Sequence, residues 1–282
     1  MVIDFHTHTF PKKIAAPTLE KLQHMARSKP YTDATEDGLR RSMENAGVDV
    51  SILLPVMTNS RQVQKLNERA AQLNETWEQT GLLSFGGMHP ECTEYREELS
   101  RAVQLGLKGI KLHPAYQGMD FDDIRYLRII DRASELGLII MTHAGIDIGI
   151  PDHDYCSPTH VKHVMKEVAP DQLILAHMGG WQNWDAVEQE LAGMPLYFDT
   201  AFSTGIIRPA KGTTRAPEES YQMNEQRFAK LVRAHGCDRI LFATDCPWSA
   251  QDEVLNFIKN CGFSEQEEKA ILGENARKLL QI

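Results

Sequence analysis

The sequence predicts a (β/α)8 barrel, or TIM barrel, formed by a single α/β domain over residues 1–282. Eight short apolar runs recur along the chain, and longer amphipathic segments separate them. The 282 residues also suit a barrel of this kind, which typically takes about 250. An open, doubly wound sheet is the alternative that the same alternation allows. Within a barrel, we expect the functional site at the C-terminal ends of the strands.

The apolar runs are the expected strands. Each is five to eight residues long and rich in Val, Ile, Leu and Phe, as parallel strands buried on both faces usually are. In chain order the runs are 2–6, 49–56, 82–89, 107–113, 138–143, 173–177, 195–200 and 239–245.

Helices are expected where apolar residues recur every three or four positions. Segment 61–79 shows this pattern from Val63 to Trp77. The tail, 264–280, is expected to form two short helices outside the barrel. The remaining predicted helices are 92–105, 120–136, 157–168, 183–192, 219–234 and 250–259.

Two connections are unusually long, residues 9–35 after the first strand and residues 201–218 after the seventh. Loops of this length in a compact domain are usually functional lids or disordered segments. Both follow C-terminal ends of expected strands, so we expect them to determine the choice of substrate.

Composition excludes several classes of protein. The formal net charge of −9 argues against binding to nucleic acid or to an anionic membrane, which clustered Lys and Arg would favour. The five cysteines are scattered, and the amino terminus does not resemble a signal peptide, so we expect a cytoplasmic protein with reduced thiols. The motifs of dinucleotide-binding proteins, P-loop proteins, serine hydrolases and HExxH metalloproteases are absent. The expected partner is a small-molecule substrate, and a homodimer stays open.

Side chains that bind metals stand at four of the strand ends. His6 and His8 form an HxH pair, in which the period of two along a strand directs both rings to the same side. His143, His177 and Asp245 end the fifth, sixth and eighth strands. Because the ends of barrel strands share one rim, these residues predict a site for a divalent ion.

Motifs along nearly the whole chain resemble the amidohydrolase superfamily. The resemblance is to its amidohydrolase-related branch, which includes aminocarboxymuconate-semialdehyde decarboxylase, resorcylate-type decarboxylases and many TIM-barrel hydrolases. It is specific for the fold and the metal site and not for the substrate. The motifs are DFHTH (4–8), GGMHP (86–90), KGIKLHP (108–114), MTHAG (141–145), LAHMGG (175–180), ATDCPW (243–248) and GENARKLL (273–280).

The resemblance implies roles for the residues at the strand ends. His6, His8, His143 and Asp245 would hold one divalent ion, most often zinc. Asp245 would also take a proton from water bound to that ion. His177 would lie beside the ion and polarise a carbonyl group or assist a proton transfer, and a second ion with His177 as a ligand stays open.

Five further residues are candidates for the substrate pocket. Lys111 lines the pocket, forms an ion pair inside the barrel or, when carboxylated, bridges two ions. His89 and His113 either face the pocket or accept hydrogen bonds from turn backbone. Arg208 either grips a substrate carboxylate or is an exposed loop residue, and Trp248 either walls the pocket or packs in the core.

These features predict a metal-dependent hydrolase that acts on an ester, lactone or amide of a small substrate, which could carry a carboxylate. The alternative is a non-oxidative decarboxylase or hydratase of a small carboxylic acid on the same scaffold. A barrel that only binds a ligand is disfavoured because no expected metal ligand is replaced by an apolar residue. A TatD-type nuclease is disfavoured because it requires a glutamate in the fourth strand, where this chain has Lys111 and His113.

Overall fold

The computed structural model describes residues 1–216 and 220–282. The chain divides into two compact units, the first formed by Met1–Leu53 with Asp199–Ile282 and the second by Leu54–Phe198. Residues 217 and 218, which end the second of the long connections, lie outside the described residues. No helix in the described part of the chain has the length and apolarity needed to cross a bilayer.

The first unit contains the strands from both ends of the chain. Strand β1 (Ile3–Thr7) pairs in parallel with β2 (Val50–Leu53), and every residue of both strands is buried. Strand β9 (Ile240–Leu241) is short and also buried. The backbone N–H of Phe5 donates to the carbonyl of Phe242, 2.8 Å away, which holds the segment after β9 beside β1.

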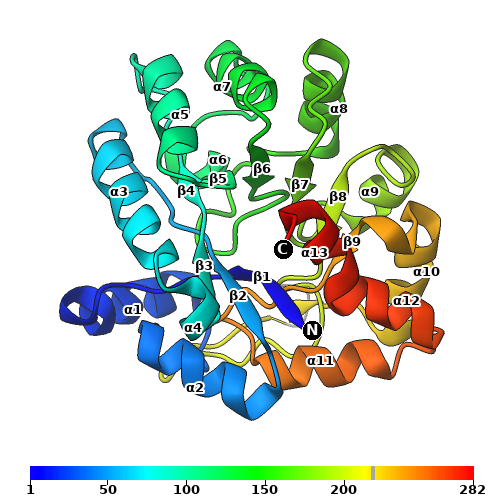
Figure 1. The fold of residues 1–282 in the computed structure, drawn as a ribbon. Coiled ribbons are helices and arrows are strands. Elements are labelled where there is room, and N and C mark those ends of the chain that lie inside the picture. Colours follow the sequence, from blue (N-terminus) through cyan, green and yellow to red (C-terminus); the bar gives the residue numbers. More distant parts are fainter. Residues whose placement is uncertain (217–219) are drawn as a thin grey trace. The chain divides into compact units, whose positions relative to one another are not determined.

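Six helices accompany these strands in the described residues of the first unit. Helices α2 and α11 pack against each other (Figure 1). A π-helical turn, Ala270–Glu274, joins the two short helices of the tail. The bounds are α1 (Lys12–Ala26), α2 (Glu36–Ala46), α10 (Glu225–His235), α11 (Gln251–Lys259), α12 (Glu265–Lys269) and α13 (Asn275–Leu280).

Two of these helices are missing from the sequence prediction. Helix α1 lies within the expected loop 9–35 and keeps Pro17 inside it. Most of α1 is exposed, so its sequence shows little of the apolar periodicity by which helices were predicted. Helix α2 is mostly polar and is fixed by its ends: the Thr35 side chain accepts from the N–H of Gly38, and Gly47 adopts a left-handed conformation after the last turn.

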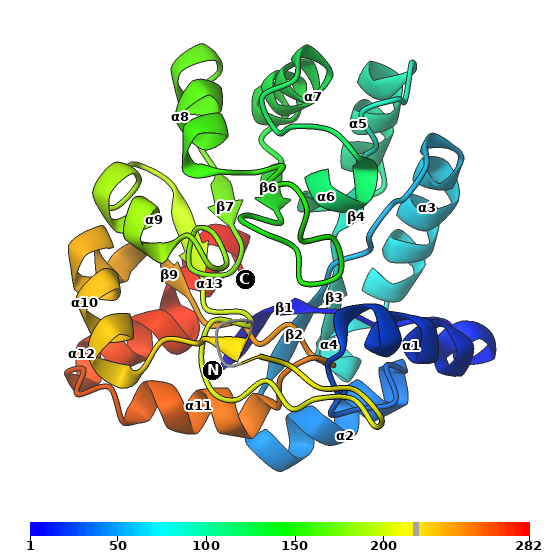
Figure 2. The ribbon, with the colours of Figure 1, turned by 180° about the vertical axis from the view of Figure 1, so that it is seen from behind.

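The two long connections meet within the first unit. Ser28, just after α1, forms an antiparallel bridge with Pro209, and the N–H of Lys29 donates to the carbonyl of Arg208 at 2.7 Å. In Figure 2 the segment that contains Pro209 runs toward α1 and α2. The expectation of two loops is therefore corrected. The first connection contains helix α1, and backbone hydrogen bonds hold its end beside the second connection.

The second unit contains a parallel sheet in chain order, β4-β5-β6-β7-β8. The third apolar run splits at Phe85 into two short strands. Gly109 lies where a Cβ would stand 2.4 Å from the Phe85 ring, so only glycine fits there. The bounds are β3 (Leu82–Ser84), β4 (Gly86–Gly87), β5 (Gly109–Leu112), β6 (Ile139–Thr142), β7 (Leu173–Leu175) and β8 (Tyr197–Asp199).

Helices follow the strands of the second unit and lie side by side around them (Figure 1). The longer ones bury one face, as α7 does with Tyr126, Ile129, Ile130 and Ala133. The single turn α6, directly after β5, was not expected. The bounds are α3 (Val63–Asn74), α4 (Trp77–Thr80), α5 (Tyr95–Gln104), α6 (Pro114–Gln117), α7 (Ile124–Glu135), α8 (Pro158–Glu167) and α9 (Trp184–Glu190).

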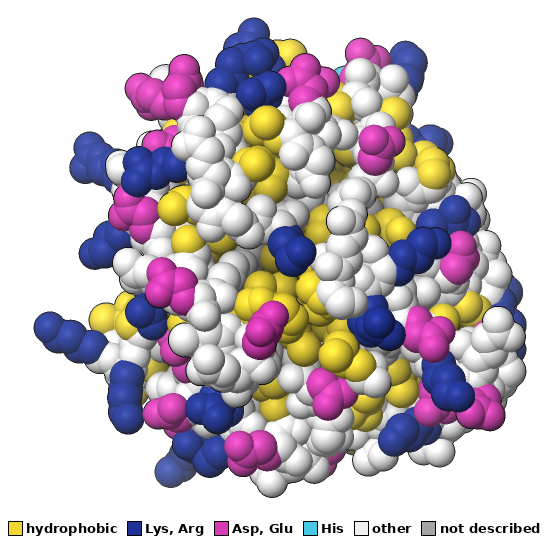
Figure 3. All heavy atoms as spheres, viewed as in Figure 1, with side chains coloured by type: hydrophobic (Ala, Val, Ile, Leu, Met, Phe, Trp, Pro, Cys, Tyr) yellow, Lys and Arg dark blue, Asp and Glu magenta, His cyan; other side chains and the backbone are white. Residues whose placement is uncertain are grey.

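Charged side chains are mixed on the surface. On the face drawn in Figure 3, Lys and Arg side chains are interspersed with Asp and Glu side chains. Such a pattern differs from the clustered positive charge that a phosphate backbone attracts.

Candidate metal centre

Two histidines and one aspartate converge in the first unit. His6 and His8 leave the end of β1, and their Nε2 atoms are 3.0 Å apart. Asp245 follows β9, and its Oδ1 lies 3.1 Å from Nε2 of His8 and 3.6 Å from Nε2 of His6. An ion in tetrahedral coordination with bonds of about 2.1 Å holds its ligand atoms about 3.4 Å apart. The three donor atoms therefore fit one divalent ion.

Asp199 holds His6 in the orientation that an ion requires. Its Oδ2 lies 2.7 Å from Nδ1 of His6, and both side chains are almost fully buried. Its Oδ1 accepts from the N–H of Ala201 at 3.0 Å, which fixes the carboxylate. Because the carboxylate accepts, Nδ1 of His6 carries the proton and Nε2 keeps the lone pair that a metal needs. Sequence reasoning missed Asp199, although it is the next-to-last residue of the seventh apolar run, close to the strand end as His6 and Asp245 are.

Asp245 has an uncommon backbone conformation, with φ at 63° in the left-handed region. Its N–H donates to the carbonyl of His6 at 2.8 Å, and its own carbonyl accepts from the N–H of Trp248 at 2.8 Å. Such conformations in residues other than glycine gather at functional sites, where the surroundings hold them. The Trp248 side chain is half-buried, and its role as a pocket wall stays a prediction.

Asp4 lies buried beneath this group. Its Oδ2 accepts from Oγ1 of Thr244 at 2.6 Å and from Nε2 of Gln251 at 2.7 Å. Burial raises the pKa of Asp4 from 3.8 to about 6, although these hydrogen bonds lower it. The folded protein therefore binds a proton at Asp4 more tightly than the unfolded chain does.

This raised pKa makes stability depend on pH. The contribution of Asp4 is fully present below pH 3.8 and is lost as the pH rises through about 6, which amounts to about 3 kcal/mol. We compare the unfolding free energies of the metal-free wild type and of metal-free Asp4→Asn. We expect the difference between them to fall by about 3 kcal/mol between pH 4 and pH 7. Denaturant titrations at several pH values measure it, and a constant difference across this range would contradict the prediction.

A second group lies in the second unit, where His113 follows β5 and His143 follows β6. Their rings stack with centroids 4.4 Å apart and planes 12° apart. Asp147 Oδ2 lies 3.8 Å from Nε2 of His113 and 4.0 Å from Nε2 of His143. These three side chains are buried and close enough together to be considered as metal ligands. Asp147 was not predicted, because it lies in an irregular segment with no repeating pattern.

His143 is a neutral imidazole in this environment. Burial, followed by the nearby His113, His177 and Lys111, lowers the pKa of His143 well below 6.5. Its Nδ1 is 3.0 Å from Nε2 of His177, and its buried Nε2 has no hydrogen-bond partner among the residues that the structure describes. A neutral ring is the form that binds a metal, and the assignment of His143 as a metal ligand stays a prediction.

The backbone around His143 and His177 is tightly constrained. A Cβ on Gly145 would stand 2.3 Å from the backbone nitrogen of Trp181, so no side chain fits there. The N–H of Trp181 donates to the carbonyl of Ala144 at 3.0 Å. His177, like Asp245, has a backbone in the left-handed region, with φ at 61°. This conformation marks it as a second functional candidate. These contacts fix the segments that carry both histidines.

The remaining pocket candidates have identifiable neighbours. Lys111 is buried in β5, and its charge is among the causes of the low pKa of His143. Nδ1 of His89 accepts from the N–H of Glu91 at 3.2 Å, and Nδ1 of His113 accepts from the N–H of Tyr116 at 3.3 Å. Both histidines thus make the turn hydrogen bond that was the alternative to a pocket role.

Arg208 lies in the first unit and pairs with a carboxylate of the protein. Its guanidinium is 2.5 Å from Oε1 of Glu253 in α11 and lies over the ring of Tyr31. The side chain is about half exposed. Its predicted contact with a substrate carboxylate stays a prediction.

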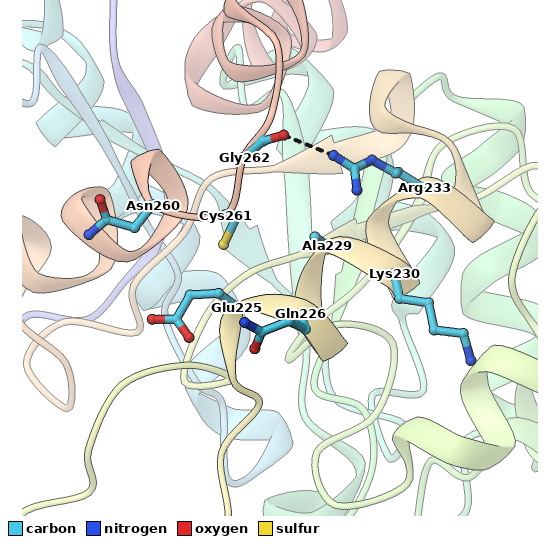
Figure 4. A pocket seen from close by; sticks show the side chains of 8 residues that line it. All are labelled: Glu225, Gln226, Ala229, Lys230, Arg233, Asn260, Cys261 and Gly262. Atoms are coloured by element: carbon cyan, nitrogen blue, oxygen red, sulfur yellow. Dashed lines mark hydrogen bonds between the residues drawn. The ribbon is translucent and has the colours of Figure 1, made fainter.

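A groove of about 480 Å³ lies elsewhere in the first unit, between α10 and residues 260–262 (Figure 4). Arg233 reaches across it and donates to the carbonyl of Gly262 at 2.9 Å. Burial raises the pKa of the Cys261 thiol to about 12, which keeps it unreactive at neutral pH. None of the residues that line the groove is a predicted ligand or catalytic residue.

Comparison with known proteins identifies structures with a similar fold. Among solved structures, an uncharacterised TIM-barrel protein from Bordetella bronchiseptica is 16% identical, with a TM-score of 0.74 over 99% of this chain and 98% of that chain. A dihydroxybenzoic acid decarboxylase from Polaromonas sp. JS666, solved with manganese and 2-nitroresorcinol, is 16% identical, with a TM-score of 0.68 over 99% and 96%. A probable 2-pyrone-4,6-dicarboxylic acid hydrolase from Acinetobacter baumannii, solved with citric acid, is 13% identical, with a TM-score of 0.65 over 100% and 99%.

Likeness at these identities shows the fold, and it confirms the predicted TIM barrel. No curated protein matches the sequence significantly. The sequence pattern of the amidohydrolase family, however, matches residues 3–282. This match covers nearly the whole chain and includes every residue of both groups described above. The chain therefore belongs to the amidohydrolase family of metal-dependent enzymes.

Proposed function

We propose that this chain is a metal-dependent hydrolase that cleaves an ester, a lactone or an amide of a small substrate. The observation that carries the proposal is the convergence of His6, His8 and Asp245, whose donor atoms lie 3.0–3.6 Å apart. A divalent ion held there, for which we propose zinc, would supply an activated water and polarise a carbonyl group.

The residues of the chain have distinct parts in this proposal. His6 and His8 would hold the ion through Nε2 together with a carboxylate oxygen of Asp245, and Asp199 keeps His6 in the required tautomer. Asp245 accepts a proton from the attacking water, because its carboxylate lies at the group and is only partly exposed. His143 stays the proposed fourth ligand, and His177, whose Nε2 is 3.0 Å from His143, stays the proposed group that polarises the substrate.

Decarboxylation of a small carboxylic acid is the second candidate. It is supported by the fold neighbour that is a dihydroxybenzoic acid decarboxylase. Arg208, which a carboxylated substrate of either reaction was predicted to use, pairs with Glu253.

Direct assays separate the two reactions. The zinc-loaded and manganese-loaded protein is incubated with a panel of aryl esters and lactones that includes 2-pyrone-4,6-dicarboxylate, and with 2,6-dihydroxybenzoate. We expect acid release from at least one ester or lactone, abolished in Asp245→Asn. Carbon dioxide release from 2,6-dihydroxybenzoate with no turnover of the panel would replace hydrolysis with decarboxylation.

A further inference from the structure

The second group, formed by His113, His143 and Asp147, has the composition of a metal site, but its hydrogen bonds indicate another use. Nδ1 of His113, the residue before α6, accepts a hydrogen bond from the backbone N–H of Tyr116 in that helix. An imidazole nitrogen that accepts is unprotonated, so the neutral ring carries its proton on Nε2. Nε2 of His113 is therefore a donor, and it has no lone pair for an ion.

The position of His113 is fixed by further contacts. The N–H of His113 donates to Oε1 of Gln117, while Nε2 of Gln117 donates to the carbonyls of Met57 and Met88 at 2.9 and 2.8 Å. His113 is thereby attached to two neighbouring segments of the second unit. Its ring is further held by stacking on His143. The orientation of the Nε2–H bond is built into the fold.

The contrast with the first group is direct. In His6 the Nδ1 atom donates to Asp199 and leaves a lone pair on Nε2, whereas in His113 the Nδ1 atom accepts and leaves a proton on Nε2. The two groups have the same residue types, but His113, unlike His6, lacks the tautomer that coordinates an ion.

We propose that His113 and Asp147 form a donor–acceptor pair that binds a hydroxyl group of the substrate beside His143. His113 Nε2–H and Asp147 Oδ2 are 3.8 Å apart, so one oxygen can lie within reach of both. A hydroxyl group can accept from His113 and donate to Asp147 at once, whereas a carboxylate would be repelled by Asp147. This inference rests on the proposed function only in taking His143 as a metal ligand next to the bound substrate.

The test begins with the metal and the tautomer. His113→Asn keeps an oxygen that can accept the N–H of Tyr116, so α6 retains its cap. We expect this variant to bind the same number of zinc ions per chain with the same affinity as the wild type. Nitrogen-15 NMR of the zinc-loaded wild type is expected to show His113 protonated on Nε2. Loss of an ion in the variant, or an unprotonated Nε2, would overturn the inference.

The substrate hydroxyl is tested with two probes of equal charge. Calorimetry compares 2,6-dihydroxybenzoate with benzoate on the zinc-loaded protein. We expect the hydroxylated probe to bind about tenfold more tightly, and this preference to vanish in His113→Asn and in Asp147→Asn. His153→Asn, at an exposed histidine paired with Asp120, is the matched control and keeps the preference.

The outcomes separate this inference from the proposed function. A wild-type preference below about threefold, including absence of binding by both probes, contradicts the hydroxyl site. If both His113→Asn and Asp147→Asn still prefer 2,6-dihydroxybenzoate to benzoate, other residues bind the hydroxyl group, and the proposed hydroxyl site is contradicted. If no ester, lactone or benzoate is turned over but the preference behaves as expected, the proposed reaction fails while the hydroxyl site stands.

Discussion

Replacement of both histidines at the end of β1, in the variant His6→Ala with His8→Ala, is expected to remove the metal ion and with it all activity. Structural zinc sites contribute about 10–16 kcal/mol, which is about 3 kcal/mol for each of four ligands. Loss of two ligands therefore weakens zinc binding by about ten-thousandfold. Elemental analysis after dialysis and competition with a chromophoric chelator measure this loss.

The control is His153→Ala, since His153 is about half exposed and pairs with Asp120, which is also exposed. It is expected to keep its ion and its thermal stability. The thermal transitions of all proteins are compared in chelator, so that loss of metal is distinguished from loss of fold. A double variant that retained full metal content and full activity would refute the assignment of His6 and His8.

The second large effect is expected at Asp199, which would act on the ion indirectly, by orienting His6. Asp199→Asn preserves the volume of the side chain but removes its charge, so Nδ1 of His6 loses a charge-assisted hydrogen bond. Removal of such an orienting partner typically costs 10–100-fold in metal affinity. We expect a loss in that range for zinc, together with a proportionate fall in activity at fixed metal concentration that excess zinc restores.

Asp171→Asn, which changes an exposed aspartate, serves as the matched control for charge. It is expected to leave zinc affinity unchanged. If Asp199→Asn lowers activity equally at all zinc concentrations while its zinc affinity matches the wild type, Asp199 does not act through the ion.

The strands could be predicted because their burial leaves a direct trace in the sequence. Parallel strands covered on both faces need continuous apolar runs, and each of the eight runs contains a strand of the structure. Helix α1 could not be predicted in the same way, since it is largely exposed and contains Pro17. Helix α2 is fixed by its capping residues more than by an apolar face.

The site was predicted to the extent that it obeys the same rule. His6, His8 and Asp245 stand at strand ends, and the structure brings their donor atoms together. Asp199 obeys the rule as well and could have been found by it. Asp147 could not, because its place depends on an irregular segment. The pairing of Arg208 with Glu253 could not either, because it joins positions 45 residues apart in sequence through tertiary contacts alone.

The positions of His6 and Asp245 in the chain have a consequence for the life of the protein in a cell. These two residues are separated by most of the sequence, yet their donor atoms are 3.6 Å apart. An ion held by both cross-links the first strand to the last, as a disulfide would, and stabilises only chains in which both segments are folded. Metal supply is thus expected to set the lifetime of the protein: chains made during metal shortage open more often and are degraded sooner.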